Sequence, residues 1–380
     1  MRRVAMILPG LGRVQRGAET AFLEVARALR RDPGVEVELF GSGRDVPDGL
    51  AIRGVECTPR ERFERWPRFP TLRSENHYEE LSFVLSLARN HAYHPEDFDA
   101  VVSCSYPWLN WYLRLAGGRR RSRGPKQIFV TQNGDWACRA EGREFRFFGC
   151  DGLICINPEY YNRHRGRYVS ALIPNGVDAS VYRPAAEADG DAWDDPRVPS
   201  SGRVVLMVSA LIPPKRVSDA VRAVARVEDG FLLVAGDGRE REAVAALAAE
   251  LLPGRHLLLG SLPRAIMPGL YRRADAFLHM HHEEPFGIAY LEAGATGLPV
   301  VAPDAAVPRW ILGEHARYAD PGNPEAVASA LREALDPATG PAMGAGLRRR
   351  VLDGWTWDVQ AARYRDFIDR VVSGREGERN

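Results

Sequence analysis

Two glutamates, Glu284 and Glu292, enclose a segment with the residue types of an anion site. Pro285 and Gly287 between them disfavour one continuous helix. We therefore expect Glu284 in a loop after a strand, Gly287 at the start of a helix, and Glu292 in its early turns. The first amides of such a helix are free to bind an anion, and carboxylates accept hydrogen bonds from hydroxyls. A sugar diphosphate offers both groups, although Glu292 also fits as an ordinary match to the helix dipole.

A lysine upstream adds a positive charge. Lysine and arginine total 51 residues, but only Lys126 and Lys215 are lysines. Lys215 follows Pro213-Pro214 and lies between a predicted strand and the next helix, where an ammonium group suits a phosphate. The alternative is a solvated loop cation. Lys126 lies in no motif that we can name.

Other motifs narrow the class of protein. Gly10-x-Gly12 and Gly236-x-Gly238 both lack the third glycine of a dinucleotide fingerprint, and no P-loop motif occurs. A Rossmann dehydrogenase is therefore a weak alternative, which an absence of NAD binding would exclude. The sequence His281-His282-Glu283 suggests a metal site, but adjacent histidines on a strand or loop point in opposite directions and no third ligand is evident. We expect no metal.

The composition sets further limits. The chain has 380 residues and a formal net charge of +1, which suggests two domains and argues against a nucleic-acid partner. No apolar run approaches the roughly 18 residues of a membrane span, and the N-terminus has no signal-peptide pattern. Five cysteines without a CxxC pair favour a reduced, cytoplasmic protein.

Alternating strands and helices must position these residues. Apolar runs predict strands at 4–8, 35–40, 100–103, 127–131 and 152–156, and again at 204–208, 232–235, 256–259, 276–280 and 299–302. Apolar spacing predicts helices at 18–30, 218–227, 239–251, 267–273, 289–294, 324–335 and 358–372. This alternation is typical of an α/β protein with two doubly wound, Rossmann-like domains that face a central cleft.

Composition also suggests the domain boundaries. Residues 185–202 are acidic and rich in helix breakers, which is typical of a linker. We place the first domain at 1–184 and the second at 203–355. Residues 58–80 have no clear period, and we interpret them as a long irregular excursion that could form an acceptor loop.

In combination, the motifs resemble the retaining nucleotide-sugar glycosyltransferases of family 4, which have the GT-B fold. The resemblance covers most of the chain. The final segment from Trp355 resembles the one that closes this fold, so residues 356–380 are expected to pack back on the first domain. The matching segments are Gly17-Ala18-Glu19, Pro174–Asp178, Lys215, Leu232–Gly238, Leu259–Leu262 and Glu284–Glu292.

The resemblance implies a role for each matching residue. Gly17 and Ala18 would give amides to the diphosphate, Lys215 would neutralise it, and the turn at Gly236 would complete the donor site. Glu284 would hold hydroxyls of the donor sugar, Glu292 those of the ribose, and Leu262 would meet the base through its backbone. Three main-chain amides would bind sugar and phosphate: those of Phe286, Gly287 and Ile288.

Two departures from the family pattern stand out. Ala210 occupies the place of an arginine that usually accompanies the lysine, and Arg216 or Arg13 would have to replace it. The histidine that the first domain often offers to the donor sugar is also missing, so that Asn133 or Gln132 would have to serve. Asp135 would orient the acceptor hydroxyl, or is simply a turn former after Asn-Gly.

The expected reaction moves a hexosyl or N-acetylhexosaminyl group, with retention, from a UDP-sugar (or, second, a GDP-sugar) to a hydroxyl of a natural product, glycan or glycolipid precursor. No cofactor is expected. A catalytically weakened nucleotide-sugar-binding relative is the alternative, because of Ala210. We expect a monomer or a homodimer. A basic cluster could contact anionic lipid or a phosphorylated acceptor, or is simply a solvated helix end and loop. An aromatic group could line a sugar or polyketide pocket or simply pack a core. The basic residues are Arg114, Arg119, Arg120, Arg121, Arg123 and Lys126, and the aromatic ones are Tyr106, Trp108, Trp111 and Tyr112.

Overall fold

The computed structural model describes residues 1–14, 16–43, 49–116, 124–139, 141, 145–185, 193–200 and 203–374. The chain forms two compact units. The first contains Met1–Asn175 together with Trp357–Asn380, and the second contains Gly176–Thr356. Of the expected linker, residues 186–192 and 201–202 lie outside the described residues.

The first unit is built on a seven-stranded parallel sheet in the order β3-β2-β1-β4-β5-β6-β7. The inner part of its central strand is apolar because helices cover both faces, and Val4–Ile7 are at most 1% exposed. The strands are β1 (Arg2–Ile7), β2 (Val35–Gly41), β3 (Ile52–Gly54), β4 (Ala100–Ser103), β5 (Lys126–Val130), β6 (Gly152–Cys155) and β7 (Ser170–Leu172).

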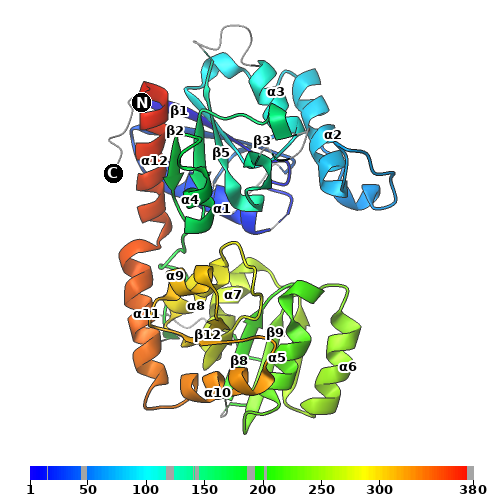
Figure 1. The fold of residues 1–380 in the computed structure, drawn as a ribbon, viewed down its shortest axis with the longest axis vertical. Helices are drawn as coiled ribbons and strands as arrows, with labels where there is room; N and C mark the ends of the chain where they lie inside the picture. The colour runs from blue at the N-terminus through cyan, green and yellow to red at the C-terminus, as the bar shows by residue number, and fades with distance from the viewer. Residues whose placement is uncertain are drawn as a thin grey trace. The chain divides into compact units, whose positions relative to one another are not determined.

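Helices from both ends of the chain cover this sheet. The last helix, α12, packs beside α1 in the first unit (Figure 1), as the resemblance predicts. Arg2 Nε donates to Asp369 Oδ1 at 2.8 Å, and Arg365 Nη1 donates to Asp32 Oδ2 at 2.8 Å. The helices are α1 (Gly17–Leu29), α2 (Glu75–Arg89), α3 (Trp108–Ala116), α4 (Pro158–His164) and α12 (Trp357–Ser373).

The structure corrects the expectation of an irregular segment over residues 58–80. A short 3₁₀ turn occupies Arg60–Phe63, and α2 begins at Glu75, within the segment. Most of the apolar positions that α2 buries, such as Phe83 and Leu87, lie beyond residue 80. The helical period was therefore hidden by the boundary that we placed there.

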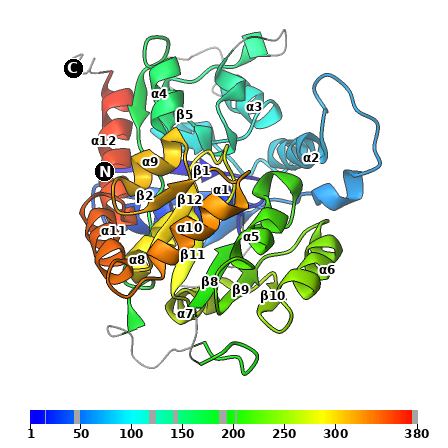
Figure 2. The ribbon, with the colours of Figure 1, turned by 60° about the horizontal axis from the view of Figure 1, so that its bottom comes forward.

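The second unit has a six-stranded parallel sheet in the order β10-β9-β8-β11-β12-β13. Alternate residues of β8, Val205 and Met207, pack into the core formed with α5, α6 and α10, which lie together in Figure 2. The strands are β8 (Arg203–Val208), β9 (Gly230–Ala235), β10 (His256–Gly260), β11 (Ala276–Leu278), β12 (Val300–Pro303) and β13 (Arg317–Ala319). The helices are α5 (Val217–Val224), α6 (Arg241–Leu251), α7 (Met267–Arg273), α8 (Ile288–Thr296), α9 (Ala306–Leu312), α10 (Pro324–Ala334) and α11 (Gly340–Gly354).

The strand order places a crevice in each unit. In the first sheet the order reverses at β1, which lies between β2 and β4, and in the second at β8, which lies between β9 and β11. Chain segments that leave the carboxyl ends of such strands turn to opposite faces and leave a crevice between them. In the second unit those segments carry Lys215, after β8, and Glu284, after β11. Each unit thus has its own natural site for a ligand.

Candidate functional site

Lys215 and Glu284, far apart in the sequence, form an ion pair at the crevice of the second unit. Lys215 ends a 3₁₀ turn, Pro213–Lys215, and its Nζ also lies 3.3 Å from His281 Nδ1. That same nitrogen of His281 lies 2.8 Å from Glu284 Oε2. The side chains of Lys215 and His281 therefore converge on one carboxylate oxygen of Glu284. Lys215 and Glu284 were predicted from separate segments, whereas the part played by His281 was not.

The electrostatics of this cluster favour an ionised Glu284. Burial alone would raise the pKa of Glu284, but the hydrogen bond with His281 and the charge of Lys215 outweigh burial and lower it to about 2. His279 lies behind the cluster, with Nε2 at 3.6 Å from Glu284 Oε2. Burial lowers the pKa of His279 to about 4, although Glu284 opposes the shift. At neutral pH Glu284 is therefore ionised where it meets Lys215.

Gly287 makes the link between Glu284 and α8. Its φ is +83°, in the left-handed region that favours glycine, and an added Cβ would lie 2.8 Å from the Tyr290 ring. The helix then begins at Ile288, as the proline and glycine of the segment predict. Phe286 is buried against Trp310 and Trp355, with ring centroids at 6.2 and 6.0 Å, which fixes the segment that presents the first amides of α8.

Glu292 lies in the second turn of α8 and contacts two tyrosines that the sequence did not single out for this role. The hydroxyl of Tyr271 donates to Glu292 Oε2 at 2.7 Å, and Tyr182 also hydrogen-bonds to the carboxylate. Burial, followed by the charge of Glu292, raises the pKa of Tyr182 and of Tyr271 well above the ordinary value. The side chain is therefore held in a fixed orientation.

The glycine turn after β9 packs closely on the segment after β8. A Cβ at Gly236 would overlap the carbonyl oxygen of Ser209, and one at Gly238 would overlap that of Leu211. Gly236 N donates to Gly260 O at 2.8 Å, which joins this turn to the end of β10. Leu262 follows there, half-buried. These glycines are explained by close packing of backbone.

The arginines that could replace the missing motif arginine are both engaged. Arg216 has φ +53° and donates through Nε to Asp219 Oδ2 at 2.8 Å. It lines an open hollow of about 430 Å³ beside His281 and His282. Arg13 belongs to the first unit, where it pairs with Glu79 and donates to Ser42 Oγ at 2.8 Å. Ala210 itself is exposed.

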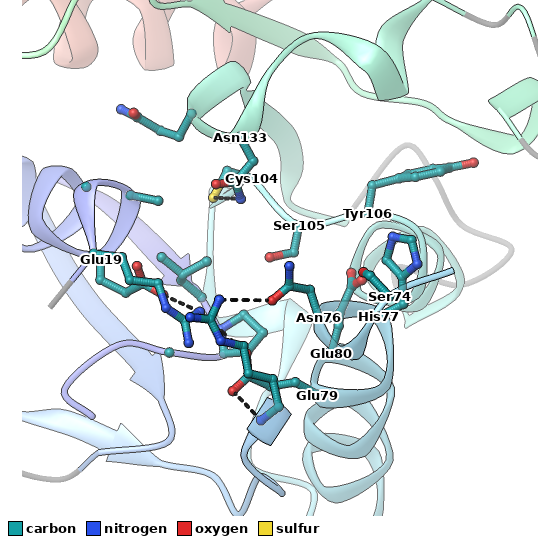
Figure 3. A pocket seen from close by; sticks show the side chains of 18 of the residues that line it. Glu19, Ser74, Asn76, His77, Glu79, Glu80, Cys104, Ser105, Tyr106 and Asn133 are labelled. Carbon is teal, nitrogen blue, oxygen red and sulfur yellow. Dashed lines mark hydrogen bonds and ion pairs between the residues drawn. The ribbon is translucent and has the colours of Figure 1, made fainter. Parts of the chain in front are cut away.

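The first unit has a hollow of about 530 Å³ at its own crevice (Figure 3). Gly17, Ala18 and Asn133 line it, as does Gln132, whose amide exchanges two hydrogen bonds with Asn175. Asn133 Nδ2 lies 3.7 Å from Cys104 Sγ. The hollow thus unites the residues that we predicted from two separate segments of the first unit.

Three glutamates in this hollow escaped the sequence analysis as site residues: Glu19 of α1, and Glu79 and Glu80 of α2. All three are 4% exposed. Burial raises the pKa of Glu19, and it raises that of Glu80 to about 8 even though Glu80 Oε1 accepts the amide hydrogen of Leu109 at 2.9 Å. The sequence signal that could have identified these residues is the adjacent pair Glu79-Glu80 in an amphipathic helix.

Asp135 does not line the hollow. It is 2% exposed, and its carboxylate contacts Arg163, Arg139 and His164, the last with Nε2 at 3.0 Å. Burial would raise the pKa of Asp135, but these hydrogen bonds lower it. Both oxygens are occupied in a cluster that ties the turn after β5 to α4.

Metal sites and membrane spans are two other features that the described residues could form. No group of three or more His, Cys, Asp or Glu side chains is arranged to hold a metal ion within the part of the chain that the structure describes. Likewise, none of the described helices has the length and apolar character needed to cross a membrane. Of the basic cluster, Arg119, Arg120, Arg121 and Arg123 lie outside the described residues.

Comparisons with known proteins agree with this architecture. Residues 15–181 match the family described as Glycosyltransferase Family 4, and residues 193–341 match Glycosyl transferases group 1. A D-inositol 3-phosphate glycosyltransferase of Kineococcus radiotolerans is 30% identical over 98% of this chain and 94% of its own. A GDP-mannose-dependent alpha-(1-6)-phosphatidylinositol monomannoside mannosyltransferase of Mycolicibacterium smegmatis is 29% identical over 69% of this chain and 74% of its own.

A solved structure shares the fold. Sucrose-phosphate synthase from Thermosynechococcus elongatus aligns with a TM-score of 0.76 and 20% identity over 98% of this chain and all of that one. The two parallel sheets, the two family matches and the full-length relative together confirm the resemblance seen in the sequence. The chain belongs to glycosyltransferase family 4 and has the GT-B fold.

Proposed function

We propose that this glycosyltransferase moves a hexosyl group from a nucleoside-diphosphate sugar to an acceptor hydroxyl, with retention at the anomeric carbon. One observation carries the proposal: Lys215 and Glu284 meet beside the start of α8 at the crevice of the second unit. The lysine and the helix amides suit the diphosphate, and the carboxylate suits sugar hydroxyls. Glu292, fixed by Tyr271, suits the ribose hydroxyls.

The reaction balances without a protein nucleophile. The acceptor oxygen forms a bond to the anomeric carbon while the bond from that carbon to the diphosphate oxygen breaks. The acceptor proton passes to the departing diphosphate on the same face. The task of the protein is to stabilise charge that develops on the leaving group, and a preorganised lysine and helix terminus serve that purpose.

Lys215 must exchange partners during this cycle. In the structure it pairs with Glu284, whereas the proposed donor complex has Lys215 on the diphosphate and Glu284 on the sugar. The donor therefore separates an existing ion pair and replaces each half of it. Because a buried charge left unpaired is costly, a donor that satisfies both halves binds better than inorganic phosphate or a sugar alone.

The first property to determine is which nucleotide base the donor carries. Our sequence analysis placed UDP-sugars before GDP-sugars, whereas the mannosyltransferase relative is named as GDP-mannose-dependent. We propose GDP-mannose as the first donor to test. Thermal-shift and calorimetric titrations with UDP, GDP and their sugars would decide, and a response to UDP alone would restore the first choice. Proton NMR of the product's anomeric coupling tests retention.

We also propose that transfer needs no metal ion or other cofactor. Lys215 and the amides of α8 supply the positive potential that a divalent cation would otherwise provide. Transfer rates should be unchanged by EDTA. A rate that falls with EDTA and returns with magnesium would contradict this.

Ala210 motivates the competing possibility of a relative that binds donor without turnover. Arg216 and Arg13, the residues that might compensate, are both paired elsewhere in the structure. Calorimetry combined with a donor-hydrolysis assay separates the two functions. Donor binding without hydrolysis or transfer to any acceptor would favour the binding protein.

A further inference from the structure

Two buried tyrosine hydroxyls converge on the carboxylate of Glu292. Tyr271 of α7 donates to Oε2 at 2.7 Å, and Tyr182, near the start of the second unit, hydrogen-bonds to the same carboxylate. Tyr271 is completely buried and Tyr182 is 2% exposed, and their rings pack edge to face with centroids 5.6 Å apart. Glu292 itself is only half-buried. The two tyrosines therefore fix, from the core, a glutamate that keeps exposed surface.

Arg264 extends this network towards the segment after β10. It begins the 3₁₀ turn Arg264–Ile266, two residues beyond Leu262, and hydrogen-bonds to the hydroxyl of Tyr182. An arginine side chain only donates hydrogen bonds, so the Tyr182 oxygen accepts from Arg264 and its hydrogen is donated to Glu292. The direction of both bonds is thus set, and the carboxylate is the final acceptor of the chain.

A carboxylate oriented in this way is prepared for a diol. A mobile glutamate loses rotamer entropy when a ligand fixes it, whereas Glu292 has already been ordered by folding. A carboxylate accepts up to about four hydrogen bonds, so two tyrosine donors do not exhaust it. Hydrogen bonds from a ligand then contribute to affinity without first offsetting the cost of ordering the side chain.

We propose that Tyr271 and Tyr182 are positioning residues that make donor binding depend on the ribose diol. They act through Glu292, and the inference rests on the proposed function, which puts that carboxylate on the ribose hydroxyls. A nucleotide without these hydroxyls gains nothing from the orientation of Glu292. The tyrosines therefore set the preference for a ribonucleotide over its dideoxy counterpart, and not the affinity for the base or the diphosphate.

Calorimetric titrations of the full chain measure this preference, with GDP against 2′,3′-dideoxy-GDP and with UDP against its dideoxy counterpart. The quantity compared is the ratio of the dideoxy Kd to the ribonucleotide Kd, because a general weakening of the fold changes both Kd values alike. The unmodified protein should have a ratio of about ten or more. Tyr271→Phe and Tyr182→Phe keep the rings and should each lower the ratio about threefold.

Tyr290 provides the matched control. It is a buried tyrosine of α8, the helix that carries Glu292, and its hydroxyl has no hydrogen-bond partner in the part of the chain that the structure describes. Tyr290→Phe should leave the ratio unchanged, and thermal unfolding of all three variants records any loss of stability separately. The proposal would be overturned by an unchanged ratio in both Tyr271→Phe and Tyr182→Phe, or by an equal fall in Tyr290→Phe.

Glu292→Gln shows whether the tyrosines act through the carboxylate. This variant should lower the ratio, and Tyr271→Phe added to it should lower the ratio no further, because the two residues form one unit. An additive effect would contradict the positioning role.

The inference and the proposed function fail in different ways. If neither GDP nor UDP bound to the unmodified protein, the proposed function would fall, and the inference with it. If a nucleotide bound and Glu292→Gln lowered the ratio while both tyrosine variants did not, only the inference would fall.

Discussion

Lys215 is the residue on which donor binding is expected to depend most. It and Glu284 satisfy one another at the crevice of the second unit, with His281 against both. Sequence reasoning identified both residues from their segments and from the scarcity of lysine. It did not identify the ion pair, because contacts between segments about 70 residues apart depend on strand order rather than on local pattern.

Lys215→Ala should weaken UDP and GDP binding roughly ten- to a hundredfold. The substitution removes a charge-assisted contact worth about 1.5–3 kcal/mol and leaves the Glu284 carboxylate facing the diphosphate. Calorimetric titration measures the loss. The second lysine of the chain provides the control, because Lys126 lies at the start of β5 in the other unit and Lys126→Ala should leave the Kd unchanged. Equal Kd values for both variants would place the diphosphate elsewhere.

His279 should make stability depend on pH in a defined window. Burial lowers its pKa from 6.5 to about 4, so the unfolded chain takes up a proton at a higher pH than the folded chain. Neutral His279 makes its full contribution to the free energy of unfolding above about pH 6.5. This contribution is lost as the pH falls towards 4, and the total loss is on the order of 3 kcal/mol.

His279→Asn removes this titration while keeping an acceptor for the amide of His281, which lies 3.2 Å from His279 Nδ1. Urea unfolding of the variant should depend less on pH between 6.5 and 4. His282→Asn, an exposed histidine of the same segment, is the control. An identical pH profile for His279→Asn and the unmodified protein would contradict the assignment.

At the scale of elements, most of the parallel strands and the start of α8 were predictable, because each depends on local pattern. The three-residue strands β3, β7 and β13 were not predicted, because runs so short have no distinct pattern. Val204–Val208 and Ala100–Val102 are continuous apolar runs, and Gly287 interrupts a helical pattern. The hollow of the first unit was not predictable, because α1, α2 and the segments after β4 and β5 all contribute to it. Judged from each helix alone, the glutamates of the hollow would be assigned to the solvent-exposed surface.

Gly287 and Gly297 allow a matched test of whether the turn at the start of α8 positions Glu284 for donor binding. Both have φ +83° and flank α8, but a Cβ at Gly297 meets nothing nearer than 3.7 Å, whereas one at Gly287 would crowd Tyr290 and lie 3.2 Å from Glu284 Cγ. Each change to alanine should cost about 1 kcal/mol or more of backbone strain. Only Gly287→Ala should also weaken donor binding.

Urea unfolding and calorimetry on the two variants separate these effects. If Gly297→Ala weakened donor binding as much as Gly287→Ala, the position of the Glu284 segment would not be the cause.

At the scale of the whole molecule, the first unit depends on residues from the far end of the chain. Tyr364, Phe367, Ile368 and Val371 of α12 are at most 6% exposed, and Phe367 lies against Gly152 of β6. Phe367→Ala should therefore destabilise the first unit by about 3–5 kcal/mol.

Hydrogen exchange measured by mass spectrometry shows which of the two units Phe367→Ala destabilises. Peptides of β1, β4 and β6 should exchange faster in Phe367→Ala, and peptides of β8 and β9 should not. Phe147→Ala, which removes an exposed ring of the first unit, is the control. Faster exchange confined to the second unit would contradict the assignment of α12 to the first.

The position of α12 also has a consequence for biosynthesis. A ribosome delivers the chain from its N-terminus, so all seven strands of the first sheet emerge before the helix that completes their unit. The second unit, Gly176–Thr356, is continuous and emerges whole in between. The part of the protein that is synthesised first is consequently the last to be completed, and a premature stop near the end of the message leaves its beginning unfinished.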